Sequence, residues 1–297
     1  MTASGVAARP APAETGTTTI HTGTNDTAGA RRIAAAFARA RADGRAALIP
    51  YVVGGYPDAD TSFEIALAAA DAGADLLEVG LPYSDPLADG ATLQRASGVA
   101  LAAGATFERS LRLIERIGAA RPELPLVPMG YANQILGGGD GEAVARRLAA
   151  AGAAGLIVAD LTPDEGAPFE AVARASELAI VYLVAPTTPP ARRAAVAART
   201  GGFLYCVSLV GVTGARTSLP ATVGKLVRDV KAVSPVPVAV GFGVSRPTHV
   251  RAIAKAGADG VIVASALVDA LGPEGRDVVR LERLVGDLRA ATMLPAG

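Results

Sequence analysis

The feature that most constrains the fold is an alternation of short apolar segments with Ala-rich segments, which begins at residue 46 and continues toward the C-terminus. The apolar segments are rich in β-branched residues and leucine, as buried strands are, and the segments between them have the composition of helices. This alternation is typical of repeated strand–helix units that build a parallel sheet. The sequence therefore predicts an α/β fold.

Eight strands can be counted, and eight is the number of units that closes a (β/α)8 TIM barrel. The predicted strands are 46–53, 76–82, 124–131, 155–160, 180–185, 203–209, 236–243 and 260–265, with helices such as 62–72 and 143–151 between them. An extra N-terminal helix over 28–42 is expected to cover the bottom of the barrel. Residues 1–28 are predicted to be a flexible N-terminal leader and 29–297 a single barrel domain.

An open, doubly wound sheet is the main structural alternative, because it is built from the same units. That fold often carries a GxGxxG nucleotide fingerprint after an early strand, and the candidate segment here, VVGGYP at 52–57, does not match it. A small-residue turn recurs as DAGAD from 71, AAGAAG from 150 and KAGADG from 255, which supports repeated units. The barrel is therefore favoured.

Composition limits the partners and the compartment. Lys plus Arg and Asp plus Glu both number 28, so no overall charge favours nucleic acid or an anionic membrane. No apolar run reaches the ~18 residues of a membrane span. The single cysteine, Cys206, excludes an internal disulfide. These observations predict a cytoplasmic protein with a small-molecule substrate.

Barrel enzymes carry their chemistry at the C-terminal ends of the strands, and the second strand is the most informative one. Alternation places Glu78 on the same face as Leu76 and Gly80, so that a carboxyl group lies inside an apolar strand beside a glycine that leaves space. Burial raises the pKa of a carboxyl group toward the range suited to general acid–base catalysis. The alternative interpretation is a Glu held in an ion pair within the barrel.

The following loop, PYSDPLADG at 82–90, carries Asp85 and Asp89 over the predicted barrel mouth. With Glu78, three acids are expected near one opening, an arrangement that a magnesium site would also use. Strand ends elsewhere add Asp160, for which a role in a turn or a helix cap is at least as plausible as a role as a ligand.

The sixth strand places Tyr205 on one face with Phe203 and Val207, where its hydroxyl could reach an interior polar group. The alternative for Tyr205 is a packed core residue with one hydrogen bond. The long polar loop that follows, VGVTGARTSLP, has the composition of a mobile lid with Thr213 and Arg216 as its polar handles.

The last two strands end in GFGVS and ASALV, at the positions where barrels of this type bind phosphate. The backbone N–H groups of Gly243, Ala264 and Ser265, with the Ser265 hydroxyl, are the predicted anion ligands. No metal is required by this interpretation.

Six motifs taken together, LLEVGLPYSDPLADG, MGYAN, IVAD, YCVSLVGVTGAR, VGFGVS and SALV, resemble the tryptophan synthase alpha chain family over residues 29 to about 292. The resemblance implies a lyase that cleaves indole-3-glycerol phosphate by retro-aldol chemistry to indole and glyceraldehyde 3-phosphate, without metal or organic cofactor. It implies Glu78, Asp89 and Tyr205 as catalytic residues, with Asp89 accepting from the indole N–H.

The resemblance also implies the remaining contacts. Phosphate would be bound by Gly214, Gly243, Ala264 and Ser265; the indole pocket would be lined by Tyr51, Met129, Tyr131, Ile157 and Leu183; and Pro82, Tyr83 and Asp85 would face a beta chain. That partner, a PLP enzyme, would join this chain in an alpha2beta2 complex. The sequence departs from the family pattern at Val53, Ala91, Leu209, Val210 and Ala264, and none of these changes removes a catalytic group.

Three functional alternatives remain open at this point. The first is a diverged stand-alone lyase that releases free indole or an analogue for a specialised pathway. The second is a catalytically silent barrel that activates a beta chain. The third is a magnesium-dependent enzyme acting on phosphorylated sugars or enolates.

Overall fold

A computed structural model describes residues 26–207, 221–241 and 243–294 of the chain. Its strands are β1 Ala47–Val53, β2 Leu77–Gly80, β3 Leu126–Gly130, β4 Gly155–Val158, β5 Ala179–Val181, β6 Leu183–Val184, β7 Leu204–Val207, β8 Val238–Gly241 and β9 Gly260–Val263. Each strand pairs in parallel with its neighbours among the described residues, and the sheet order is β5-β4-β3-β2-β1-β9-β8-β7-β6. The predicted α/β architecture is confirmed.

The barrel closes at Tyr182, which divides the predicted fifth strand into β5 and β6. β5 pairs with β4 and β6 pairs with β7, so the two halves of one strand form the two ends of the sheet order. Between them, the Tyr182 carbonyl accepts a hydrogen bond of 3.0 Å from the Tyr205 N–H. The Tyr182 hydroxyl donates to Glu170 at 2.5 Å and anchors this junction to a surrounding helix. The nine labelled strands therefore correspond to the eight predicted ones.

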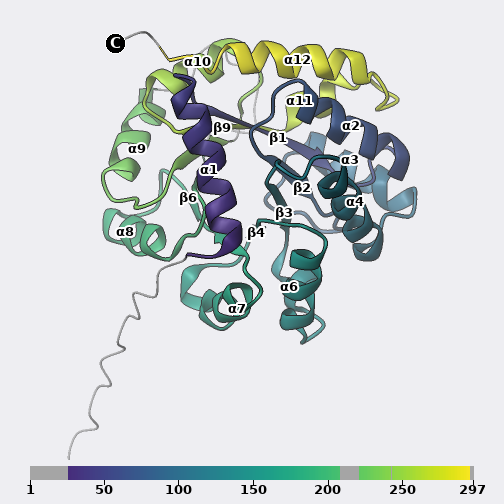
Figure 1. Cartoon of the computed structure of the whole chain (residues 1–297), viewed down its shortest axis with the longest axis horizontal. Helices are drawn as coiled ribbons and strands as arrows, with labels where there is room; N and C mark the ends of the chain where they lie inside the picture. Colours follow the sequence, from purple (N-terminus) through teal and green to yellow (C-terminus); the bar gives the residue numbers. More distant parts are fainter. Residues whose placement is uncertain (1–25, 208–220, 242, 295–297) are drawn as a thin grey trace, which may run out of the picture.

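Helices surround the strands, as the ring of coloured ribbons in Figure 1 shows. They are α1 Ala28–Ala42, α2 Ala59–Asp71, α3 Ala91–Ala102, α4 Phe107–Ala120, α5 Ala132–Leu136, α6 Gly141–Ala150, α7 Pro163–Ala175, α8 Pro190–Arg199, α9 Ala221–Lys231, α10 Pro247–Lys255, α11 Ser265–Ala270 and α12 Val278–Ala290. Several begin at a residue whose side chain accepts from the first turn, such as Thr27, Asp58 and Thr106. Among the described residues, no helix is long and apolar enough to cross a membrane.

Helix α1 covers the N-terminal ends of the strands, in front of the barrel in Figure 1. Its buried face inserts Ile33 and Phe37 between the strands, and the Phe37 ring lies 5.7 Å from the ring of Phe203. Glycines make room for it: a Cβ on Gly155 would lie 3.2 Å from the Ile33 side chain, and one on Gly260 would lie 2.8 Å from the Phe37 ring. The expected closure of the barrel bottom is observed.

The recurring small-residue turn has one structural role in all three places. The N–H groups of Asp75, Ala154 and Asp259 each donate to a carbonyl of the preceding strand, at 2.9, 2.8 and 2.8 Å. The glycines of these turns have positive φ, which favours glycine because other residues are strained there. Where the turn ends in aspartate, the carboxylate accepts a second N–H of that strand, from Leu48 for Asp75 and from Val238 for Asp259.

Asp75 also forms the most buried ion pair of the described residues, with Arg45 at the bottom of the barrel. Two guanidinium nitrogens of Arg45 contact the two carboxylate oxygens at 2.6 and 2.8 Å, and the exposed fractions of the two side chains are 4% and 11%. Removing one partner of such a pair leaves a buried charge without compensation.

We expect Asp75→Ala to lower the free energy of unfolding by about 3 kcal/mol, because the buried Arg45 would lose its two-oxygen partner and keep only the ion pair with the more exposed Asp43. Urea denaturation followed by circular dichroism measures this change. The control is Asp60→Ala, which breaks the exposed Arg116–Asp60 pair and should have little effect. Equal losses in the two variants would contradict the assigned importance of the buried pair.

Candidate active site

Glu78 lies on β2 inside the barrel, and its side chain is 1% exposed. Among the described residues it forms no ion pair, and its Oε2 atom has no hydrogen-bond partner. The alternative of an ion-paired structural Glu is therefore not realised in this part of the chain. Burial, followed by the nearby charge of Asp89, raises the pKa of Glu78 to about 8.

The space that Gly80 leaves beside Glu78 is filled by the side chain of Tyr51. Tyr51 pairs in register with Glu78, and a Cβ on Gly80 would lie 1.8 Å from the Tyr51 hydroxyl oxygen. The same arrangement recurs across the barrel, where a Cβ on Gly241 would lie 2.4 Å from the hydroxyl of Tyr205. Glycine on one strand thus allows a phenol from the neighbouring strand to lie against its backbone.

Tyr205 on β7 is buried, and its ring lies 6.4 Å from that of Phe203 on the same face of the strand. Burial raises the pKa of its hydroxyl well above the usual value, and the charges of Glu78 and Asp89 raise it further. Tyr205 therefore lies within electrostatic range of both carboxyl groups.

Asp89 is half-buried in the loop after β2, and burial raises the pKa of its carboxyl group to about 6. A hydrogen-bonding interaction with the Tyr131 hydroxyl lowers this pKa in part. The loop is held by two further contacts: the Ala88 N–H donates to the Tyr131 hydroxyl at 3.1 Å, and the Gln94 amide donates to the Asp89 carbonyl at 2.9 Å. Sequence analysis assigned no role to Gln94, and no local signal marks it.

Strand register places the predicted indole-pocket residues on the faces that carry the carboxyl and phenol groups. Met129 pairs with Gly80 on one side and with Ile157 on the other, and Leu183 pairs with Tyr205. Because directly paired residues point to the same side of a sheet, these side chains face the barrel interior with Glu78. The expectation that they share one region with Glu78 and Tyr205 is therefore consistent with the register.

The expected convergence of three acids is wrong for the described residues. Asp85 is exposed, and it accepts a hydrogen bond from its neighbour Ser84. In the part of the chain that the structure describes, no three His, Cys, Asp or Glu side chains lie together as a metal site would require. Asp160 accepts a hydrogen bond of 2.7 Å from the Ala132 N–H at the start of α5, which is the helix-capping role considered for it.

The predicted phosphate ligands lie at the ends of two paired strands. Gly243 follows β8 with φ +70°, a conformation that favours glycine, and Ala264 and Ser265 follow β9 at the start of α11. Ala264, which replaces a glycine of the family pattern, has φ −122°, outside the left-handed region that favours glycine. Gly214 and the lid residues Thr213 and Arg216 lie outside the described residues.

The loop after β2 presents a mixed surface. Pro82 is buried, Tyr83 is half-buried and stacks on Tyr131, and Asp85 is exposed. Leu87 is 91% exposed, which is unusual for a large apolar side chain. Its place in a turn-rich loop between two aspartates gave a signal for exposure that the sequence analysis did not use.

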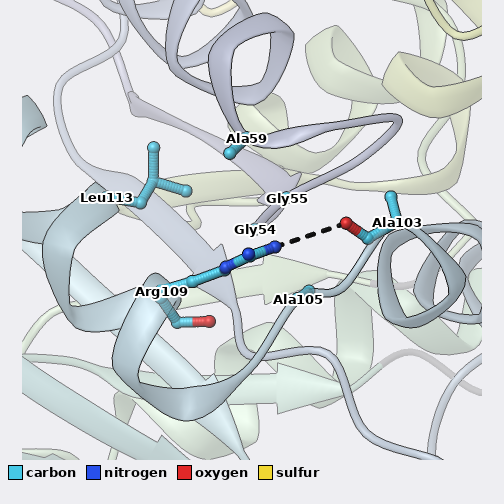
Figure 2. A pocket seen from close by; sticks show the side chains of 8 residues that line it. Gly54, Gly55, Ala59, Ala103, Ala105, Arg109 and Leu113 are labelled. Carbon is cyan, nitrogen blue, oxygen red and sulfur yellow. Dashed lines mark hydrogen bonds between the residues drawn. The ribbon is translucent and has the colours of Figure 1, made fainter.

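A separate hollow lies outside the barrel, between the end of β1 and the start of α4 (Figure 2). Figure 2 shows the Arg109 guanidinium extending across it to the Ala103 carbonyl, and a second donation reaches the Gly104 carbonyl at 2.8 Å. Arg109 thereby satisfies carbonyl groups at the C-terminal end of α3. These two contacts are a structural role for Arg109, since they join the start of α4 to the end of α3.

The chain is similar in sequence and in fold to proteins of one known family. Residues 37–293 match the family model described as "Tryptophan synthase alpha chain". Proteins with that name from Roseiflexus castenholzii and Carboxydothermus hydrogenoformans are 46% and 50% identical over 260 and 240 residues, covering 87% and 80% of this chain and 99% and 88% of theirs. A solved chain of Mycobacterium tuberculosis tryptophan synthase is 43% identical with a TM-score of 0.81, over 89% of this chain and 98% of that one. The chain therefore belongs to the tryptophan synthase alpha chain family.

Proposed function

We propose that Glu78 moves the proton and Asp89 binds the indole nitrogen when this chain, a lyase by its family membership, cleaves indole-3-glycerol phosphate. The observation that carries the proposal is the difference between the pKa values of two interacting carboxyl groups, about 8 for Glu78 and about 6 for Asp89. At pH 7 the first is mainly protonated and the second mainly ionised. Two interacting carboxyls with separated pKa values are suited to different roles in one reaction.

The reaction breaks the bond between indole C3 and the side chain, so C3 must gain a proton and the adjacent side-chain hydroxyl must lose one. Protonated Glu78 can donate to C3, and its carboxylate can then accept the hydroxyl proton as the aldehyde forms, which restores its starting state. Ionised Asp89 can accept from the indole N–H and stabilise the positive charge that develops on the ring when C3 is protonated.

The remaining assignments complete this arrangement. We assign Tyr205 as the tyrosine beside the carboxyl pair, and Gly243, Ala264 and Ser265 as donors to the substrate phosphate. The support for the phosphate site is the position of these three residues at neighbouring strand ends, where backbone N–H groups can converge on an anion. Gly214, Thr213 and Arg216 remain predictions, as does the indole pocket formed by Tyr51, Met129, Tyr131, Ile157 and Leu183.

We infer that the chain works in the cytoplasm, without a cofactor of its own, as the alpha subunit of an alpha2beta2 heterotetramer whose beta chain carries PLP. The support for a partner is the loop after β2, where Tyr83, Asp85 and the 91% exposed Leu87 form a surface next to Asp89. Exposed apolar and aromatic side chains beside polar residues are typical of a protein interface. Because Asp89 belongs to the same loop, binding of a partner there would also affect the position of its carboxyl group.

The central test is a steady-state assay of indole-3-glycerol phosphate cleavage, titrated with a tryptophan synthase beta chain. We expect turnover that rises strongly on addition of the beta chain. Turnover that the beta chain leaves unchanged would indicate the stand-alone lyase, and activation of a beta chain without any cleavage would indicate the catalytically silent barrel.

Glu78→Gln should lower kcat by about 10²–10⁴-fold, because the amide can neither donate nor accept the proton. The matched control is Glu115→Gln, which makes the same change on the exposed side of α4 and should retain normal turnover. Normal cleavage by Glu78→Gln would contradict the assigned chemistry.

Treatment with EDTA should leave the rate of cleavage unchanged, since the reaction as proposed has no step that requires a metal. The measurement is the initial rate before and after chelation and again after addition of Mg²⁺. A loss with EDTA that Mg²⁺ reverses would favour the magnesium-dependent alternative.

The raised pKa of Glu78 also predicts an effect on stability. Between about pH 4.5 and pH 8 the unfolded chain is ionised at this position and the folded chain is protonated, so the free energy of unfolding falls as pH rises through this range. Glu78→Gln lacks this titration. We therefore expect the variant to gain about 4 kcal/mol relative to wild type between pH 5 and pH 9, measured by urea denaturation. A constant difference across this range would show that Glu78 does not titrate in this way.

A further inference from the structure

Tyr131 lies between the strand that positions it and the loop that carries Asp89. It directly follows β3 and begins α5, so its backbone is fixed on the barrel. Its ring stacks on Tyr83 with a centroid distance of 5.3 Å and an interplanar angle of 24°. The side chain is 5% exposed, which leaves it little freedom to change rotamer.

The Tyr131 hydroxyl contacts the loop at the residue before Asp89. It accepts a hydrogen bond of 3.1 Å from the Ala88 N–H. A phenol oxygen that accepts one hydrogen bond can still donate its own proton, and the residue after Ala88 is Asp89, whose pKa this hydroxyl lowers. One side chain of the barrel therefore accepts a hydrogen bond from the backbone of this loop and acts on the pKa of the carboxyl group at the next residue.

We infer that Tyr131 is a positioning residue for Asp89, in addition to any contact that its ring makes with the substrate. Its hydroxyl holds the Ala88–Asp89 segment against the barrel and orients the carboxylate as an acceptor for the indole N–H. This inference rests on the proposed function of Asp89. It assigns to the hydroxyl a role that lining an indole pocket would not require, because an apolar ring would line the pocket equally well.

The charges around Asp89 agree with this role. Burial raises the pKa of Asp89, whereas the Tyr131 hydroxyl lowers it by stabilising the ionised form. Burial and the charge of Asp89 raise the pKa of Tyr131 far above neutral pH, so the hydroxyl keeps its proton and remains a donor. The other charged group that acts on Tyr131 is Asp160, which also raises its pKa. Loss of the hydroxyl should therefore shift the titration of Asp89 to higher pH.

The test uses Tyr131→Phe, which keeps the ring and removes only the hydroxyl. The measurement is the pH dependence of kcat/KM for indole-3-glycerol phosphate cleavage in the complex with a beta chain. We expect the acidic limb to move up by about one pH unit, so that kcat/KM falls roughly tenfold near pH 5.5 and much less near pH 7.5. An unmoved acidic limb would overturn the inference.

The matched control is Tyr182→Phe, which removes a buried tyrosine hydroxyl that also donates to a carboxylate, Glu170, at the outer face of the barrel. It should leave the acidic limb where it is in wild type. An equal shift in this control would show that the effect of Tyr131→Phe is a general consequence of losing a buried hydroxyl, and would overturn the inference.

A second measurement separates this inference from the proposed function. Carbon-13 NMR of protein labelled at the aspartate carboxyl groups follows the titration of Asp89 without substrate, with Asp89→Asn to assign its signal. Tyr131→Phe should raise this pKa, and an unchanged value would overturn the inference. Absence of cleavage by the wild type, together with a raised Asp89 pKa in Tyr131→Phe, would refute the proposed function while the contact between the two residues stood.

Discussion

Burial of the Glu78 carboxyl group inside a closed barrel is the constraint on which the candidate site depends. A carboxylate in an apolar interior is unfavourable unless it is paired, and Glu78 forms no ion pair among the described residues. The group therefore keeps its proton at neutral pH, which reduces stability at high pH and suits Glu78 to the acid role proposed for it. Stability and reactivity at this position have the same physical cause.

The barrel gives Glu78 a fixed position. Helix α1 closes the bottom with Ile33 and Phe37, and the Arg45–Asp75 pair joins the start of β1 to the turn before β2. These contacts fix the strands at the bottom of the barrel, which is the end opposite the candidate active site. Asp89 is held differently, by side-chain contacts to a loop, so its position is more sensitive to single substitutions than that of Glu78.

Tyrosine side chains lie between the barrel strands, which carry Glu78, and the loop that carries Asp89. Tyr51 and Tyr205 lie against glycines of neighbouring strands and interact electrostatically with both carboxyl groups, while Tyr131 contacts the loop. Phenol groups suit this environment because they bury a large apolar ring and retain one polar atom. Tyr131 also stacks on Tyr83, so the surface proposed to face the beta chain is in direct aromatic contact with the residue proposed to position Asp89.

The sequence by itself determined the strand–helix units, the extra N-terminal helix and the inward direction of Glu78, because these depend on local composition and on the two-residue period of a strand. It also marked the loop with Asp89 and the strand ends with Gly243 and Ser265. Only the tertiary structure decided that Asp85 turns away, that Tyr51 fills the space over Gly80, and that the Tyr131 hydroxyl reaches the Asp89 loop. Those outcomes depend on contacts between separate units of the barrel, and no local pattern specifies the distance between side chains that meet only after the sheet has closed.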